Sequence, residues 1–481
     1  MVQLGPNKTI HTAVGPPGAG KTEAFLSNIN TSLAAGKRIV LAVPTLALID
    51  EVSDRAHKKK IAHTQIDHRA GNAVAYNLEK ALADEANTFI ICTQESIRGI
   101  RSKLIKTWVM VIDELPKIVD YPDYSTNPVE LKRILEYTEE RDGQLWIPAE
   151  HVEVVKTQIN THKGESQKIN TSTLGPSAAH VFRLLLSKVE VFIDAPVSDG
   201  RRHIRAVEEY TAWWELISEA TEVHVLTASI KSSEFEIFAE VYGFHFIPSE
   251  FTPVQRHPAR DITILPIMPN GQYFTKSMMT APYGEGRYID TILFHIKSVM
   301  TSTPLLFANK WAKLESAKGF RYVGLDCRGL NAYSDATEAI LLFGGNPSPS
   351  EQLGLKQLAV KYHRDFYNAF ITTRLLQPSL QAVGRTAVRN FGNSHPIRLY
   401  VQDNRVAEYL ILTYFSDASL DWSLAVTVPT KRDARLLSLE DIAKVKQLIA
   451  SNLKDLPIHK ITGISRAKIR QIRKSTQPPT R

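Results

Sequence analysis

The chain has 481 residues, of which 43% are hydrophobic and 22% are charged, a composition typical of a globular protein of about three domains. It contains no apolar run long enough to span a membrane and does not begin with the apolar core of a secretion signal, so we expect an intracellular protein without membrane contact. Its two cysteines, Cys92 and Cys327, lie far apart, which excludes a disulfide framework, a cysteine-rich zinc module and an iron–sulfur cluster.

The positive charge is concentrated at the carboxyl-terminal end. Residues 431–481 contain 13 Lys and Arg against 4 Asp and Glu, a net charge of +9, whereas the other residues contain 45 basic and 46 acidic side chains. A basic segment on a neutral body favours a polyanionic partner, most often a nucleic acid. The alternative is a basic tail that serves only solubility.

The first 115 residues alternate β-rich runs with helical patterns, which predicts a parallel sheet with helices on both faces. We expect helices from the glycine-rich turn to Ala35 and over Leu46–His57. The expected strands are Thr9–Val14, Arg38–Val43, Thr88–Thr93 and Trp108–Ile112.

The regular pattern lapses between about 120 and 205, which indicates an inserted subdomain, with a hairpin expected to turn at His162–Glu165. The pattern resumes with a predicted helix over Ile204–Ala220 and a strand over Val223–Thr227. We expect Trp213 and Trp214, inside that helix, to pack in the core and at its rim.

A second α/β unit is expected over 256–427, after a linker at 249–261, and a small basic helical unit over 428–481. The first unit is then 1–255, including the insertion. The expected strands of the second unit are Ile262–Pro266, Pro304–Phe307, Arg321–Leu325, Ala339–Phe343 and Ile397–Val401.

A phosphate-binding loop follows the first strand and opens the first helix. The sequence fits G-x-x-x-x-G-K-[ST] in full, and its glycines allow backbone N–H groups to face a phosphate at a helix N-terminus. Lys21 is expected to reach the β- and γ-phosphates of a nucleotide, and the Thr22 hydroxyl to bind Mg²⁺. The loop consists of Gly15, Pro16, Pro17, Gly18, Ala19, Gly20, Lys21 and Thr22.

Two carboxylates, Asp113 and Glu114, follow the apolar strand that begins at Trp108. Since ligands of α/β sheets bind at the carboxyl ends of the strands, Asp113 is expected to hold Mg²⁺ and Glu114 to activate the attacking water. A weaker rival is the apolar run Val191–Asp194, which lacks the following glutamate.

With these two motifs the chain resembles a superfamily-two helicase, and further motifs follow in that family's order over about 15–390. Asp113-Glu114 is followed by Leu115-Pro116, so it is neither a DEAD nor a DEAH box. The resemblance implies nucleic-acid contacts for Pro44, Thr45, Thr93, Gln94, Asn309 and Lys310. It implies coupling of hydrolysis to domain movement for Thr227, Ala228, Ser229, Arg328, Gly329, Asn331 and Asp335.

A segment that resembles the sixth motif of that family contains Gln381, Arg385 and Arg389. These residues are spaced i, i+4, i+8, so on a helix they would share one face. Arginines on that face could stabilise the charge that develops on a γ-phosphate. The last arginine lies four residues after Arg385, where the family has three, so Arg385 is the better candidate for the arginine finger. The alternative is a solvated basic stripe.

The basic tail resembles a helix-turn-helix unit. We expect helices over Leu439–Ala450 and Pro457–Ile461, a turn at 462–465 with Ser465 as helix cap, and a third helix over Arg466–Lys474. In the third helix Ile469 and Ile472 are expected to point inward, and the residues expected to bind DNA are Arg466, Lys468 and Arg470. A generic phosphate-binding tail or a protein contact are the alternatives.

The sequence therefore predicts two tandem RecA-like P-loop domains and a helical carboxyl-terminal unit. The resemblance implies an ATP-dependent, Mg²⁺-requiring helicase or translocase, acting on DNA rather than RNA, with replication or recombination proteins as partners. The alternatives are a translocase on duplex DNA that does not separate strands and a DNA-binding replication-origin or regulatory factor switched by ATP. The fifteen histidines show no spacing typical of metal ligands.

Overall fold

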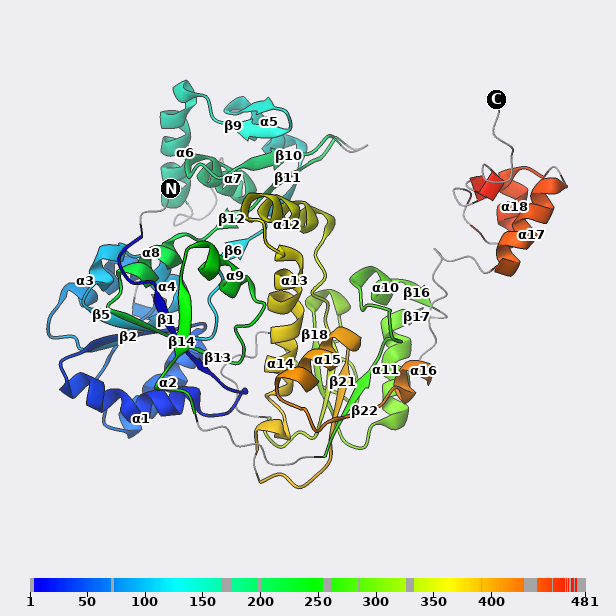
Figure 1. Cartoon of the computed structure of the whole chain (residues 1–481). Helices are drawn as coiled ribbons and strands as arrows, with labels where there is room; N and C mark the ends of the chain where they lie inside the picture. The colour runs from blue at the N-terminus through cyan, green and yellow to red at the C-terminus, as the bar shows by residue number, and fades with distance from the viewer. Residues whose placement is uncertain are drawn as a thin grey trace. The chain divides into compact units, whose positions relative to one another are not determined.

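The computed structural model describes residues 4–70, 73–165, 175–196, 200–253, 261–283, 286–325, 333–390, 392–427, 439–451 and 453–462, with 464, 466, 469, 470, 472 and 473. Its contacts divide the chain into two units, Met1–Leu424 and Ala425–Arg481. The first unit contains two parallel sheets, each the centre of one lobe (Figure 1).

The first lobe is built on a seven-stranded parallel sheet of order β14-β1-β13-β5-β2-β4-β3. The predicted strands of this lobe are confirmed, apart from shifts of one residue at some ends. The strands are β1 (Thr9–Val14), β2 (Arg38–Val43), β3 (Thr64–Ile66), β4 (Phe89–Thr93), β5 (Trp108–Asp113), β13 (Glu222–Thr227) and β14 (His245–Pro248).

Helices cover both faces of this sheet because the strands are apolar on both sides. On one face α1 and α2 pack against Ile39, Leu41 and Val43 of β2. On the other face α3, α8 and α9 pack against Val40 and Ala42 of the same strand. The helices of this lobe are α1 (Lys21–Ala34), α2 (Leu46–Lys58), α3 (Val74–Ala83), α4 (Gln94–Arg98), α8 (Ala212–Glu219) and α9 (Glu234–Val241), with 3₁₀ turns η1 (His68–Ala70) and η2 (Ser102–Ile105).

The segment between β5 and α8 forms a five-stranded antiparallel sheet of order β7-β11-β10-β9-β8. Its strands are β7 (Asp123–Thr126), β8 (Glu139–Arg141), β9 (Gln144–Trp146), β10 (Val191–Ile193) and β11 (Arg202–Ala206). Its helices are α5 (Pro128–Glu136), α6 (Val152–Glu165) and α7 (Pro176–Leu186), with the 3₁₀ turn η3 (Ala149–His151). Strands β6 (Val119–Asp120) and β12 (Glu208–Glu209) form a separate two-stranded antiparallel ladder.

Two sequence predictions in this region are wrong. Residues His162–Glu165 end helix α6 and form no hairpin; the hairpin joins β8 to β9 through Asp142 and Gly143, whose φ angles of 51° and 75° suit a tight turn. The segment Ile204–Ala220 is not one helix, because its first residues pair with β7 as strand β11, and α8 begins at Ala212. This pairing is made by residues remote in the sequence, which a local helical pattern does not report. Trp213 and Trp214 are both fully buried in the core.

The second lobe is built on a six-stranded parallel sheet of order β19-β18-β20-β21-β15-β22. All five predicted strands are present, with ends shifted by at most two residues. The strands are β15 (Ile262–Pro266), β18 (Leu305–Ala308), β19 (Arg321–Val323), β20 (Glu338–Leu342), β21 (Ile397–Val401) and β22 (Ser419–Leu420). The other elements are α10 (Lys276–Thr280), the hairpin β16 (Pro282–Tyr283) and β17 (Gly286–Arg287), α11 (Tyr288–Val299), η4 (Lys310–Ala312), α12 (Pro349–Tyr362), α13 (Phe366–Ile371), the π-helical η5 (Thr372–Leu376), α14 (Gln377–Val383), η6 (Ala387–Arg389), α15 (Asn404–Thr413) and α16 (Ser423–Thr427).

The lobes share an apolar seam in addition to the cleft between them. Figure 1 shows α12 and α13 of the second lobe beside α9 and β12 of the first. The ring centroids of Phe238 and Phe366 lie 5.1 Å apart, and those of Tyr121 and Phe370 lie 5.5 Å apart. These side chains belong to the same buried cluster as the first lobe's core, so the seam is continuous with that core.

The Ala425–Arg481 unit contains α17 (Leu439–Ala450) and α18 (Asp455–Thr462), which match the first two helices expected there. Val445, Ile458, Ile464 and Ile469 are buried together, with Ile472 packed against them. The inward positions expected for Ile469 and Ile472 are thus confirmed. Ser465, Lys468 and Lys474 lie outside the described residues, and the helix-turn-helix assignment stays a prediction.

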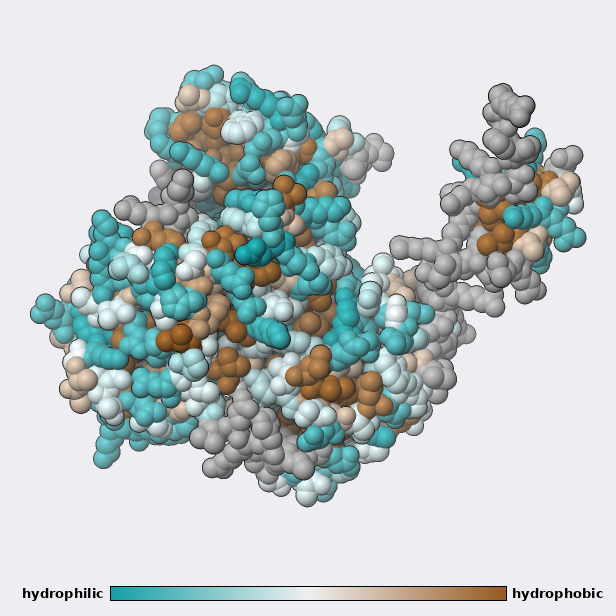
Figure 2. All heavy atoms as spheres, viewed as in Figure 1, coloured by the Kyte–Doolittle hydropathy of each residue, from teal (hydrophilic) through white to brown (hydrophobic). Residues whose placement is uncertain are grey.

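On the face shown in Figure 2 hydrophilic side chains predominate, with an apolar patch in the region of α14 and α15. Within the described ranges, none of the helices combines the length and the apolarity that a membrane span requires.

Candidate active site

The phosphate-binding loop connects β1 to α1 in the backbone conformation that its glycines permit. Gly18 and Gly20 have φ angles of 83° and 87°, a region that other residues rarely adopt, and Gly20 is the N-cap of α1. The Gly15 N–H donates to the Thr227 carbonyl at 3.2 Å, which ties the loop to the neighbouring strand β13. The loop therefore sits at the carboxyl end of the sheet, with the first turn of α1 behind it.

Lys21 lies buried within this loop. Its Nζ donates to the carbonyl oxygens of Gly15 at 2.7 Å and Pro16 at 3.2 Å. Burial lowers the pKa of Lys21 to about 8, although the nearby Asp113 and Glu114 favour its charged form. An anionic phosphate at this position would restore the full charge, so the lysine is suited to bind one.

Asp113 ends strand β5 beside the loop. The Thr22 hydroxyl donates to Asp113 Oδ2 at 3.1 Å, so the two residues expected to hold Mg²⁺ are in contact. Asp113 is 5% exposed, and burial raises the pKa of its carboxyl group, an effect that Lys21 opposes. Two oxygen donors of this kind suit a hard divalent cation.

Glu114 has a φ angle of 67°, which is strained for a residue with a side chain, and its N–H donates to the Leu226 carbonyl at 2.8 Å. The Gln94 amide stabilises this turn, because its Nε2 donates to the carbonyls of Asp113 at 2.9 Å and Glu114 at 3.0 Å. We expected Gln94 to contact nucleic acid; in the structure its amide nitrogen faces the backbone carbonyls of Asp113 and Glu114. A strained backbone held from both sides is typical of functional positions.

The second lobe contributes Gln381, Arg385 and Arg389 to the same pocket, but not from one helix. Helix α14 ends at Val383, Gly384 is its C-cap, and Arg389 lies in the 3₁₀ turn η6. The expectation of a single helical face is therefore wrong, because Gly384 and the turn after it redirect the chain. The three side chains nevertheless meet at one site.

That site is a cavity of about 390 Å³ between the lobes. Its polar lining from the first lobe includes Lys21, Thr22, Asp113 and Glu114, and Arg385 and Arg389 face them from the second lobe. Burial, followed by repulsion from Arg385, lowers the pKa of Arg389. The pocket therefore concentrates positive charge from both lobes around a place for an anion.

The lobes approach each other closely beside the pocket. A Cβ atom on Gly384 would lie 2.2 Å from Pro17 Cβ, and a Cβ atom on Gly18 would lie 2.7 Å from Arg389 Cβ. The absence of a side chain at both positions lets the phosphate-binding loop touch the second lobe. Movement of one lobe therefore changes the pocket directly.

Sequence reasoning missed four residues that line this pocket: Glu23, Leu48, Glu51 and Arg55. Arg55 forms ion pairs with Glu23 at 2.6 Å and with Glu51 at 3.5 Å. The i, i+4 spacing of Glu51 and Arg55 on α2 was a signal of a charged face, but it did not show that this face turns toward α1.

The segment Thr227–Ser229, expected to couple hydrolysis to movement, lies between the lobes. The Gln377 Nε2 donates to the Ser229 carbonyl at 3.0 Å, and the Tyr414 hydroxyl donates to the Ala228 carbonyl. Thr227 and Ser229 are buried and bonded to each other at 3.0 Å. Two side chains of the second lobe thus hold this segment of the first.

The residues expected along the nucleic-acid path lie at the carboxyl ends of strands. Thr45 and Thr93 cap α2 and α4, and the Asn309 side chain accepts from the Gly344 N–H at 3.0 Å. Pro44 precedes Thr45 at the end of β2, and Lys310 is exposed. None of these five residues, all of which the structure describes, lines the pocket.

The remaining predicted residues either lie away from the pocket or are outside the described residues. Asp335 is exposed in a turn, whereas Arg328, Gly329 and Asn331 lie outside the described residues. The rival Val191–Asp194 belongs to the inserted sheet, where Asp194 accepts from Arg205 at 3.1 Å. In the carboxyl-terminal unit Arg466 is exposed, and Arg470 pairs with Asp455 at 3.2 Å.

Comparison with known proteins agrees with this arrangement. Residues 4–146 match the family model described as DEAD/DEAH box helicase. The chain is similar to the structure of S. tokodaii Xpd4, at 13% identity and a TM-score of 0.52, over 86% of this chain and 96% of that one. It is similar to a structure described as an XPD helicase, at 11% identity and a TM-score of 0.51, over the same shares. No curated protein matches.

At such identities the likeness to solved structures shows the fold alone, which is that of tandem RecA-like lobes. The family match covers the phosphate-binding loop and both carboxylates. The match over residues 4–146 and this fold together support an ATP-hydrolysing helicase.

Proposed function

We propose that this helicase moves along or unwinds DNA, using Mg²⁺-dependent ATP hydrolysis in the pocket between its lobes. The observation that carries the proposal is the pocket itself, in which Lys21, Asp113 and Glu114 of one lobe face Arg385 of the other. Since each lobe supplies part of the site, nucleotide binding favours the closed arrangement, and product release permits opening.

The chemistry is divided between the residues. Lys21 and the loop N–H groups bind the β- and γ-phosphates, and Glu114 orients and deprotonates the attacking water. Arg385 stabilises the charge that develops on the transferred phosphoryl group, with Arg389 in a supporting position. Thr22 and Asp113 would hold Mg²⁺, which supplies neutralising charge when bound.

DNA is the proposed track because the basic carboxyl-terminal unit resembles a helix-turn-helix, whose second helix enters the DNA major groove. Its exposed Arg466 and Arg470 are suited to bind phosphates, and the net charge of +9 over 431–481 favours a polyanion. The residues proposed to contact the strand within the lobes are Pro44, Thr45, Thr93, Asn309 and Lys310.

The test is steady-state ATP hydrolysis, alone and with single-stranded DNA, duplex DNA or single-stranded RNA, at two salt concentrations. We expect DNA to stimulate turnover by about 10-fold or more, and the stimulation to weaken with salt because phosphate contacts release counterions. Stimulation by RNA alone would overturn the choice of track. Turnover that is indifferent to all three polymers would favour an ATP-switched binding factor.

Strand displacement and triplex displacement then separate the two kinds of motor. Displacement of a duplex strand supports unwinding. Displacement of a triplex strand without duplex separation would assign a translocase on duplex DNA.

A further inference from the structure

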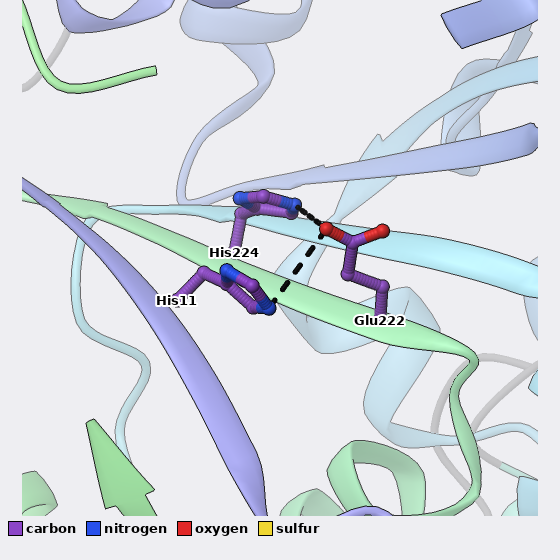
Figure 3. Close-up of side chains that lie close together, drawn as sticks. All are labelled: His11, Glu222 and His224. Atoms are coloured by element: carbon purple, nitrogen blue, oxygen red, sulfur yellow. Dashed lines mark hydrogen bonds and ion pairs between the residues drawn. The ribbon is translucent and has the colours of Figure 1, made fainter. Parts of the chain in front are cut away.

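Two histidines and a glutamate meet on one face of the first lobe's sheet (Figure 3). His11 of β1 is the direct neighbour of His224 of β13 in the parallel register. Glu222 lies two residues before His224, so its side chain points to the same face of the strand. Strand pairing brings these three side chains together although His11 is remote from the other two in the sequence.

The cluster lies away from the nucleotide pocket. Glu222 begins β13, whereas Thr227 ends it beside the phosphate-binding loop. The face is the one covered by α1, because His224 contacts Phe251 at a centroid distance of 4.6 Å and Phe251 contacts Phe25 of α1 at 5.3 Å. None of the three side chains is among those that line the pocket.

Both imidazoles direct a nitrogen toward the same carboxylate oxygen, as Figure 3 shows. The distances to Glu222 Oε1 are 2.9 Å from His224 Nε2 and 3.8 Å from His11 Nε2. A tetrahedral ion with bonds of about 2.0–2.1 Å separates adjacent ligand atoms by about 3.3 Å, which lies between these two values. The two imidazole rings stack with centroids 4.8 Å apart and planes 30° apart, so His11, which is 25% exposed, would turn its ring toward the ion when one binds.

Two of the side-chain atoms that an ion would not use, His224 Nδ1 and Glu222 Oε2, already have hydrogen-bond partners. His224 Nδ1 bonds to the Ser249 hydroxyl at 2.8 Å, and Lys37 Nζ donates to Glu222 Oε2 at 2.8 Å. A metal-bound histidine commonly bonds through its other ring nitrogen, which fixes the ring and its tautomer. These two contacts hold His224 and Glu222 with Nε2 and Oε1 facing each other.

We propose that His11, Glu222 and His224 bind a divalent transition-metal ion of the Zn²⁺ type. Imidazole and carboxylate together suit Zn²⁺ better than Mg²⁺, which prefers oxygen ligands alone. Solvent reaches the cluster beside His11 and supplies the fourth ligand. The ion joins β1 to β13, the strands that carry the phosphate-binding loop and the Thr227–Ser229 segment, and its role is structural.

The test uses the full chain without a histidine tag, freed of metal with a chelator and kept free of nucleotide. Co²⁺ serves as a spectroscopic probe, and Zn²⁺ binding is measured by calorimetry and by the shift in melting temperature. We expect one tight site, a tetrahedral Co²⁺ absorption band that Zn²⁺ abolishes, and a higher melting temperature with Zn²⁺.

His11→Ala is expected to weaken Zn²⁺ binding by about 100-fold and to remove the stabilisation. His245→Ala is the matched control, because His245 is an exposed histidine on β14 of the same sheet that lies outside the cluster. Glu222→Gln keeps the side-chain volume and provides a second variant if His11→Ala does not fold.

Absence of a tight site in the wild-type chain, or equal binding by His11→Ala and the wild type, would overturn the proposal. In that case the cluster is a hydrogen-bonded triad in which His224 Nε2–H donates a hydrogen bond to Glu222 Oε1. Neither readout uses ATP, so this outcome leaves the proposed helicase function untouched.

Discussion

The second lobe meets the first in two places of opposite character. At the pocket charged side chains from both lobes surround a cavity, whereas at the seam α12 and α13 pack apolar rings against the first lobe's core. Opening the pocket exposes charged groups that water solvates well. Opening the seam would expose apolar surface to water, at a free-energy cost of about 25 cal/mol per Å². We therefore expect the seam to hold while the pocket opens and closes, so that the seam acts as the pivot.

The largest effect is expected from Lys21→Ala at the pocket. Lys21 is the only lysine among the described residues that line the pocket. Its loss should lower ATP turnover by about 10³-fold or more, because its charge stabilises the γ-phosphate in the transition state. Steady-state hydrolysis measures the loss, and circular dichroism checks the fold. Lys103→Ala, at an exposed position of the same lobe, is the control and should hydrolyse ATP normally. Normal turnover in Lys21→Ala would refute the assigned site.

The next prediction tests the two arginines that the second lobe contributes to the pocket. Arg385→Lys keeps the charge but loses the planar fork that binds phosphate oxygens, so we expect kcat to fall by about 10²–10³-fold. Arg389→Lys should cost less, because Arg385 is the proposed finger. A larger loss from Arg389→Lys would reverse the two roles. Comparable affinity for a non-hydrolysable ATP analogue in both variants would show that the loss lies in the chemical step.

A smaller effect on activity is expected from the two hydrogen bonds by which the second lobe holds the Thr227–Ser229 segment. Tyr414→Phe removes the hydrogen bond to the Ala228 carbonyl, and Gln377→Ala removes the one to Ser229. We expect basal ATP hydrolysis to change by less than about 3-fold and DNA-stimulated strand displacement per ATP to fall by about 10-fold, because hydrolysis no longer moves the second lobe.

The control for that prediction is Tyr367→Phe, since Tyr367 is a half-exposed tyrosine on α13. If displacement per ATP stays unchanged in Tyr414→Phe and in Gln377→Ala, these contacts do not carry the coupling.

The pocket could be predicted from the sequence and the seam could not. Lys21, Asp113 and Arg385 stand in short motifs whose chemistry is local, so their types and spacing report their position. Phe238 and Phe366 look like ordinary core residues, and only the tertiary fold shows that they join two lobes. The histidine cluster was missed for a related reason, because strand register rather than sequence spacing brings His11 to His224.

The smallest expected effect concerns Glu234, a carboxyl group buried beside the seam. The Tyr121 hydroxyl donates to Glu234 Oε1 at 2.8 Å, and the Glu234 N–H donates to Thr373 Oγ1 at 3.0 Å. Burial raises the pKa of Glu234 from 4.5 to about 7, although Arg374 favours the charged form. The folded state thus retains a proton that the unfolded chain releases. The contribution of protonated Glu234 to the free energy of unfolding is therefore fully present below about pH 4.5, and it is lost as the pH rises through about 7.

Glu234→Gln should remove this dependence, because the amide oxygen still accepts from Tyr121 and carries no charge. Relative to the wild type, we expect its free energy of unfolding to rise by roughly 2 kcal/mol between pH 5 and pH 8, as a shift of this size implies. Denaturant unfolding at the two pH values measures the difference, and Glu240→Gln, at an exposed site on the same helix, is the control. An equal free-energy difference at both pH values would mean that Glu234 is charged in the fold, and the seam would then contain a buried ion rather than a neutral acid. A charged seam would separate more easily, which would weaken its role as the pivot.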